Sequence, residues 1–192
     1  MATAVGIRRA GGRREDILDA AARLFAERGF HGVGVDDIGA SVGISGPGIY
    51  RHFPSKDAML AEMLVRISER LLAEGSARVA AAADPVAALE ALVGWHIEFA
   101  LAHPALIVVQ DRDLANVAEP DRRRVRRLQR RYVEVWVVVL RDIDPDRAEA
   151  SARAAAHAVF GLINSTPHSA HALPRATMAG VLQRMATAAL LA

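Results

Sequence analysis

The stretch VDDIGASVGISGPGIYRHFPSK, residues 35–56, decides the fold of this chain. It predicts two short helices: the first begins at Val35, Gly43 closes a tight turn, and Ser45 caps the second, which continues through His52. Glycine suits the turn because it adopts positive φ at no steric cost, and helices joined by three or four residues form a helix-turn-helix. Such a motif places its second helix in the major groove of DNA. The apolar residues spaced to share one small core beneath it are Ile38, Val42, Ile44 and Ile49.

Four blocks of sequence resemble the TetR family of transcriptional repressors. They are REDILDAAARLFAERG at 14–29, VDDI at 35–38, GIS at 43–45 and, most specifically, IYRHFPSK at 49–56. The resemblance covers roughly residues 13 to 65. It implies a ligand-responsive regulator, most simply a repressor, rather than an enzyme. We therefore expect an all-α chain with a disordered basic arm at 1–12, a helix-turn-helix DNA-binding domain at 13–56 and a helical ligand-binding and dimerisation domain at 57–192.

Composition indicates a folded chain with a sizeable core but does not identify its partners. Hydrophobic residues make up 52% of the 192, and the formal net charge is only +2. Positive charge is instead concentrated in Arg8, Arg9, Arg13 and Arg14, which either lie along phosphate or form a solvated tail. Cysteine is absent, which excludes disulfides. No signal peptide and no apolar run long enough to span a bilayer is evident, so we expect a cytoplasmic protein.

Apolar spacing and helix-start signals predict helices throughout the chain and no strands. A first helix spans 13–28 and ends at Gly29, and a long one begins after a Ser55 cap and continues to about residue 83. Asp-Pro pairs at 84–85 and 144–145 each predict a further start, because aspartate caps a helix and proline suits its first position. The other predicted helices begin at Pro104, at Glu119 and at Pro174.

The resemblance also assigns the DNA contacts, residue by residue. Tyr50 and Lys56 match family positions that hold phosphate, and Arg51 and His52 are left to read bases. The chain departs from the family at 46–48, where glycine, proline and glycine offer no polar side chain, although the proline can touch a thymine methyl. The candidate DNA-binding residues are Arg13, Arg14, Ser45, Gly46, Pro47, Gly48, Tyr50, Arg51, His52 and Lys56.

The same resemblance implies an effector pocket between the middle helices. A few polar groups in an apolar lining suit a mostly hydrophobic small molecule, for which an acyl chain, an acyl thioester and a drug-like compound fit equally. The candidate lining residues are His96, Phe99, Gln110, Tyr132, Trp136, Phe160 and Asn164. No cofactor is predicted.

Two copies of the chain would read the half-sites of a near-palindromic operator as a homodimer. The last two long helices, at about 145–162 and 174–191, would pair with their copies as a four-helix bundle. Small residues on the first of them would permit close approach: Ala152, Ala155, Ala156 and Val159.

Several alternatives stay open on the sequence alone. Seven arginines between 122 and 131 are either a second nucleic-acid surface or the solvated side of an amphipathic helix, and the latter is favoured. His157, His168 and His171 make a poor metal signal. A helical enzyme would need an acid–base pair, for which only Asp111 with His96 suggests itself. A constitutive DNA-binding factor without an effector is the other rival.

Overall fold

The computed structural model describes residues 10–169 and 173–192, and within these ranges every regular element is a helix. This confirms the all-α prediction. The elements are α1 (Ala10–Arg28), α2 (Val35–Val42), α3 (Gly46–Ile49), α4 (Lys56–Ala81), α5 (Pro85–Ala102), α6 (Pro104–Asp113), the 3-10 helix η1 (Leu114–Asn116), α7 (Glu119–Ile143), α8 (Glu149–Ile163), α9 (Thr166–Ser169) and α10 (Arg175–Leu191).

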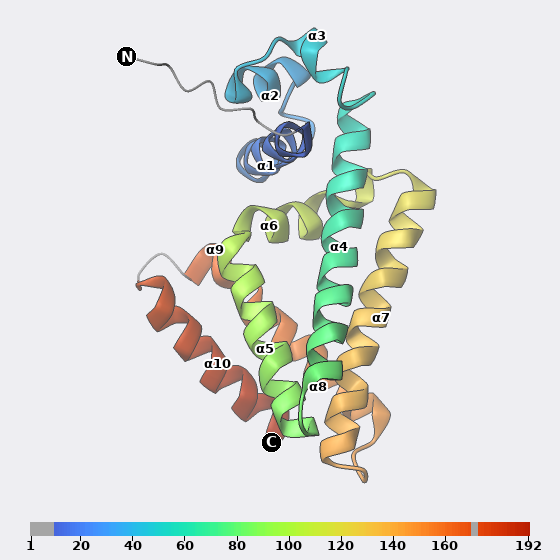
Figure 1. Ribbon diagram of the computed structural model, residues 1–192, viewed down its shortest axis with the longest axis vertical. Helices are drawn as coiled ribbons and strands as arrows, with labels where there is room; N and C mark the ends of the chain where they lie inside the picture. Colours follow the sequence, from blue (N-terminus) through green and yellow to red (C-terminus); the bar gives the residue numbers. More distant parts are fainter. Residues whose placement is uncertain (1–9, 170–172) are drawn as a thin grey trace.

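The molecule is elongated, with α1, α2 and α3 gathered at one end and α5 to α10 at the other, and α4 running between them (Figure 1). Its apolar residues form two clusters. One cluster combines α1 to α3 with residues of α6 and α7, and the other fills the space among α5, α7, α8 and α10. One apolar face of α4 contributes to both clusters, because Met59 and Met63 belong to the first cluster and Ile67 and Leu71 to the second.

Side-chain caps mark two of the predicted helix starts. The Ser55 hydroxyl accepts a hydrogen bond from the Ala58 N–H at 3.0 Å, and the Asp84 carboxylate accepts one from the Ala87 N–H at 2.8 Å. Each oxygen satisfies a backbone donor that has no partner inside its own helix.

The second Asp-Pro pair behaves differently, so the predicted start at Pro145 is wrong. The Asp144 carboxylate accepts from the Asp146 N–H at 3.2 Å, its carbonyl accepts from the Arg147 N–H at 3.1 Å, and α8 begins only at Glu149. Aspartate followed by proline suits a β-turn as well as a helix start, because proline fixes the φ that the second turn position needs.

The expected small-residue face on α8 is also wrong in detail. Ala152, Ala156 and Val159 are at most 1% exposed within a single protomer, because they pack against its own core. The small residues that α8 leaves exposed lie on another face: Ser151, Ala154, Ala158 and Gly161.

At the amino end, α1 begins at Ala10, so residues 10–12, which were assigned to a disordered arm, are helical. The rest of that predicted arm, including Arg8 and Arg9, lies outside the described residues, and so does His171. The segment after α8 contains the short helix α9.

One helix of the described chain, α5, is long and apolar enough to cross a membrane by length and composition alone. Half of it is buried inside the fold, where Leu89, Leu92 and Ala100 are fully enclosed. The expectation that no stretch approaches this length therefore needs correction, although a core helix passes the same test.

Candidate nucleic-acid interface and effector cavity

The turn between α2 and α3 has the geometry that the sequence predicts. Gly43 adopts φ 71°, and the N–H of Ile44 donates to the Gly39 carbonyl at 3.0 Å. A Cβ on Gly39 would lie 2.7 Å from the Ile44 carbonyl oxygen, so only glycine allows the two segments to approach this closely. Two of the four predicted core residues, Ile38 and Ile49, are fully buried, and Val42 and Ile44 pack against them half-buried.

The second helix is shorter than predicted, because α3 ends at Ile49. Residues 50–52 continue as a turn in which the His52 N–H donates to the Ile49 carbonyl at 2.8 Å. Gly46 and Gly48 disfavour helix, and Pro54 biases Phe53 away from helical angles, so the chain cannot extend the element further. Ser45 occupies the capping position, but its hydroxyl makes no capping hydrogen bond.

Four of the predicted DNA-binding side chains lie together on the outer surface of this segment. Ser45, Pro47 and Arg51 are exposed, and Tyr50 is 56% exposed although it is large and aromatic. Gly46 is buried, and Gly48 and His52 are half-buried. These residues stand at the end of the molecule that is farthest from α10 (Figure 1).

Arg13 and Arg14 do not belong to a free arm, because both lie in α1 and are bonded within the chain. Arg13 donates to the Val42 carbonyl at 3.1 Å. The Arg14 Nε donates to a Glu62 carboxylate oxygen at 2.9 Å, and its other nitrogens donate to the second oxygen and to the His52 carbonyl. These two arginines therefore join α1 to α2, to the segment after α3 and to α4.

Lys56 has a similar supporting position. Its ammonium donates to the carbonyl oxygens of Phe30 and Val33, both at 2.8 Å, and lies 4.4 Å from the centre of the Phe30 ring. Two of its three N–H donors are thus directed towards the loop between α1 and α2 rather than towards solvent. We infer that Lys56 holds this loop against the start of α4, and its phosphate contact stays a prediction.

A cavity of about 280 Å³ lies among α4, α5, α6, α7 and α8. Five of the seven predicted effector-binding residues line it: His96, Gln110, Tyr132, Phe160 and Asn164. The other two, Phe99 and Trp136, are not part of the lining. The Trp136 ring packs edge-on against the Phe160 ring with centres 4.9 Å apart, and the ring centres of Phe99 and His96 are 6.3 Å apart. Both side chains therefore pack against lining residues without bordering the cavity themselves.

The remaining lining residues were not predicted as ligand contacts: Ser68, Leu71, Asp111, Gln129, Val133 and His157. Helical spacing could have identified two of them. Gln129 and His157 each precede a predicted lining residue by three positions, so each shares a helix face with that residue. Gly75 is a further residue that was missed. A Cβ there would lie 2.6 Å from the Tyr132 ring, so its absence lets that ring lie against α4.

Neutral hydrogen-bonding groups supply the polarity of the interior. His96 Nε2 is 3.2 Å from the Asn164 amide oxygen, and its Nδ1 is 3.4 Å from the Tyr132 hydroxyl. Burial lowers the pKa of His96 to about 4, with the Asn164 hydrogen bond opposing the shift. Burial likewise raises the pKa of Tyr132, so neither group is charged near neutral pH. The cavity interior therefore suits an uncharged, largely apolar group.

Among the described residues that line the cavity, the single acidic side chain is exposed to solvent. Asp111 is exposed, and burial nevertheless raises the pKa of its carboxyl. No hydrogen bond joins it to His96 within residues 10–169 and 173–192, so the acid–base pair of the enzyme hypothesis is not assembled there. Over the same residues, no group of three His, Cys, Asp or Glu side chains is arranged to hold a metal ion.

The arginine-rich run lies on α7, and three of its seven members are paired. Arg122 and Arg123 both pair with Glu119, and Arg124 pairs with Glu69 at 2.6 Å. Their partners lie on the same helix or on neighbouring α4, and the other four arginines are exposed. This arrangement favours a solvated helix face.

Replacing Lys56 with methionine tests its supporting role, because the carbonyls of Phe30 and Val33 would lose their donor. We expect Lys56→Met to lower the free energy of unfolding by about 1–3 kcal/mol, the cost of leaving enclosed acceptors unpaired. Urea denaturation followed by circular dichroism measures this. Arg51→Met, which alters an exposed side chain of the same segment, is the matched control, and equal stability of the two variants would contradict the assignment.

The buried His96 makes stability depend on pH. Because its pKa is about 4 in the folded chain and 6.5 ordinarily, the unfolded chain binds a proton in this window that the folded chain does not. Stability should therefore decline as the pH falls from 6.5 to 4, by up to about 3 kcal/mol from this group. Unfolding free energies of the wild type and His96→Gln, measured across this range, isolate the contribution. Parallel pH profiles would show that His96 is not the cause.

Comparison with known proteins places these features in one family. Residues 17–63 match the family model described as bacterial regulatory proteins of the tetR family, and residues 82–168 match a model described as a Tetracyclin repressor-like C-terminal domain. The HTH-type transcriptional repressor KstR2 of Rhodococcus jostii (strain RHA1) is 37% identical over 130 residues, which are 67% of this chain and 64% of that protein. The match thus spans slightly less than two thirds of this curated relative.

Solved structures extend the similarity over nearly the whole chain. The ketosteroid transcriptional regulator KstR2 of Mycobacterium tuberculosis superposes with a TM-score of 0.74 at 27% identity, covering 95% of each chain. AibR, solved in complex with isovaleryl coenzyme A and operator DNA, shares the fold with a TM-score of 0.74 at 19% identity, over 90% of this chain and 97% of its own. With both domain models matched in order and the helix-turn-helix geometry present, the chain belongs to the TetR family of bacterial regulatory proteins.

Proposed function

We propose that this protein is a ligand-responsive transcriptional regulator, a repressor that binds a near-palindromic DNA operator as a homodimer. A mostly hydrophobic small molecule releases it. The observation that carries the proposal is the exposed outer surface of the α2–turn–α3 unit, at the end of the molecule remote from the effector cavity. The enzyme alternative has no support from the relatives, which are transcriptional regulators.

In this proposal the α3 segment enters the major groove and Arg51 reads base edges. Arginine suits this task because its fork of N–H donors matches the two acceptors of guanine. Tyr50 and Ser45 contact phosphate. Gly46 instead allows α3 to pack against α2, because a Cβ there would lie 1.8 Å from a carboxylate oxygen of Asp36. Arg13, Arg14 and Lys56 keep the segment in position through the hydrogen bonds described above.

The homodimer forms through α8 and α10. Their outward faces combine small residues of α8, such as Ala154 and Ala158, with large apolar side chains of α10, of which Met185 is 51% exposed and Leu191 is 49% exposed. Small residues permit close helix approach, and half-exposed apolar side chains gain free energy when a partner covers them. A second copy placed here carries its own α3 for the second half-site.

The effector occupies the cavity that contains His96, with its apolar part among the aromatic rings and one polar group near Asn164. Acyl thioesters are our first choice of ligand class. The interior is uncharged and the rim opens to solvent beside exposed Asp111, so an acyl chain fits inside while a charged remainder stays outside. AibR, whose structure holds isovaleryl coenzyme A and operator DNA, motivates the same choice of probe. Binding shifts the spacing of the two α3 segments away from that of the grooves.

The DNA-reading role is tested with operator duplexes selected from random sequence. We expect Arg51→Ala to weaken binding to the selected duplex by about 1–3 kcal/mol and to leave binding to a scrambled duplex nearly unchanged, because a base contact is lost. Fluorescence anisotropy at several salt concentrations measures both. Arg127→Ala removes an exposed arginine far from α3 and serves as the control. If Arg51→Ala weakens both duplexes equally, Arg51 does not read bases.

The effector role is tested by filling the mouth of the cavity. Gln129 lines it from α7 and is half-buried, so Gln129→Trp should place an indole across the entrance. We expect this variant to bind operator as the wild type does but to resist release by acyl-CoA thioesters of short, medium and long chains. Arg127→Trp, exposed on the same helix, should still be released. Release of both variants at equal thioester concentration would place the effector elsewhere, and no release of the wild type would exclude this class.

A further inference from the structure

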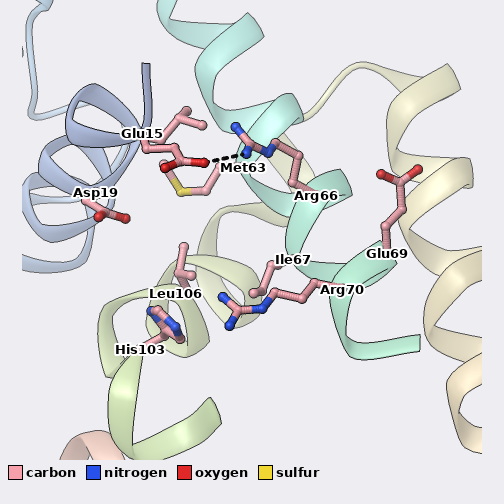
Figure 2. Close-up of a pocket in the computed structure, with 10 residues that line it drawn as sticks. Glu15, Asp19, Met63, Arg66, Ile67, Glu69, Arg70, His103 and Leu106 are labelled. Carbon is pink, nitrogen blue, oxygen red and sulfur yellow. Dashed lines mark hydrogen bonds and ion pairs between the residues drawn. The ribbon is translucent and has the colours of Figure 1, made fainter. Parts of the chain in front are cut away.

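A second cavity lies between α1, in the DNA-binding unit, and the effector domain, by which we mean the second half of α4 together with α5 to α10. We call this cavity the interdomain cleft (Figure 2). Its volume is about 430 Å³, within the range of small-molecule sites. One wall is α1, the other is formed by α4 together with the corner between α5 and α6. It shares no lining residue with the cavity around His96. Apolar side chains line part of it: Leu18, Met63, Ile67 and Leu106.

Some charges of the cleft are already paired. Arg66 forms ion pairs with Glu15 at 3.3 Å and with Glu62 at 3.5 Å, and the first of these is drawn in Figure 2. Glu69 pairs with Arg124 at 2.6 Å. These groups have little charge left to offer a ligand.

Three polar side chains of the cleft remain without a hydrogen bond or ion pair in the described part of the chain: Asp19, Arg70 and His103. Asp19 projects from the α1 wall. Arg70 and His103 lie on the opposite wall, where the Arg70 guanidinium extends towards the imidazole (Figure 2). His103 is half-buried and its ring centre lies 5.3 Å from that of Phe99, while the Arg70 guanidinium carbon is 5.5 Å from the Trp95 ring centre.

The charges that act on the His103 imidazole agree with this arrangement of side chains. Burial lowers the pKa of its imidazole, the positive charges of Arg70 and Arg175 lower it further, and the negative charge of Asp19 acts in the opposite direction. Once the paired charges are set aside, one wall presents the donors of Arg70 and His103, and the facing wall presents the carboxylate of Asp19. Apolar surface lies between them.

We propose that the interdomain cleft binds a small zwitterion of the α-amino acid class with an aliphatic side chain. The carboxylate lies between Arg70 and His103, the ammonium group faces Asp19, and the side chain rests on the apolar surface that includes Ile67. This ligand is favoured over a simple anion because Asp19 would repel an anion and would remain unpaired. A simple cation would leave Arg70 unpaired in the same way.

A ligand held in this way contacts both the DNA-binding unit and the effector domain, since Asp19 lies on α1 and Arg70 lies on α4. It would fix the orientation of α1 against α4 independently of the effector cavity. An influence on operator binding rests on the proposed function, but binding of the zwitterion does not. The two are therefore measured separately.

Isothermal titration calorimetry of the full chain with three probes of matched shape tests the proposal. Leucine carries both charges, isocaproate lacks the ammonium group, and isoamylamine lacks the carboxylate. We expect leucine to bind at least about tenfold more tightly than either of the others, since each loses one charge-assisted contact. Absence of leucine binding, or equal binding of leucine and isocaproate, overturns the proposal.

Two substitutions test which side chain contacts each charged group of the ligand. Arg70→Gln should weaken leucine binding about tenfold, and Asp19→Asn should bring leucine and isocaproate to similar affinity. Arg127→Gln and Asp142→Asn, which remove exposed charges outside the cleft, should bind leucine as the wild type does, and so should Gln129→Trp, which fills the other cavity. Unchanged leucine affinity in Arg70→Gln and Asp19→Asn overturns the site. Operator binding without leucine, measured on the same preparation, tests the proposed function independently.

Discussion

Burial of one continuous face of α4 in two separate cores is the constraint on which the rest of the structure depends. The helix has 26 residues and is therefore about 39 Å long. Its first half completes the core of the helix-turn-helix unit through Met59 and Met63, and its second half completes the core of the effector domain through Ile67 and Leu71. Because neither glycine nor proline interrupts α4 between Met59 and Leu71, this part of the helix has no such kink site, and it can carry a shift from one core to the other.

A second connection keeps the two halves in a defined orientation. Arg112 of α6 donates to the Ala26 carbonyl at 3.3 Å and to the Phe25 carbonyl at the end of α1, and it pairs with the buried Asp113. The DNA-binding unit is thus held both by α4 and by α6. A ligand that displaces α6 from within the effector cavity, which Gln110 lines, acts directly on this contact.

The fold was predictable from the sequence to the extent that local signals decide it. Apolar spacing and the caps at Ser55 and Asp84 depend on neighbours in the sequence, and the structure confirms them. Asp144–Pro145 shows the limit, because the same dipeptide satisfies a β-turn and a helix start equally well, and the following residues decide. The shortness of α3 was also readable, since Gly46, Gly48 and Pro54 all oppose helix, although the predicted helix continued through His52.

The site was predictable only in part, for a different reason. Helical spacing places His96, Tyr132 and Phe160 on inward faces, but it does not show whether an inward residue borders a cavity or fills the core. Trp136 fills the core, whereas Gln129 borders the opening of the cavity. The partners of Arg14 and Lys56 are distant in sequence, at Glu62 and at the carbonyls of Phe30 and Val33, and no local pattern marks such long-range hydrogen bonds.

The position of Lys56 has one more consequence. It is the chain's single lysine among 24 basic side chains, so apart from the amino terminus it carries the only primary amine. An ammonium group held by two carbonyls reacts with acylating reagents only when those hydrogen bonds open. The rate at which Lys56 is labelled therefore reports how often the loop before α2 separates from the start of α4, and it does so at one site without any engineered probe.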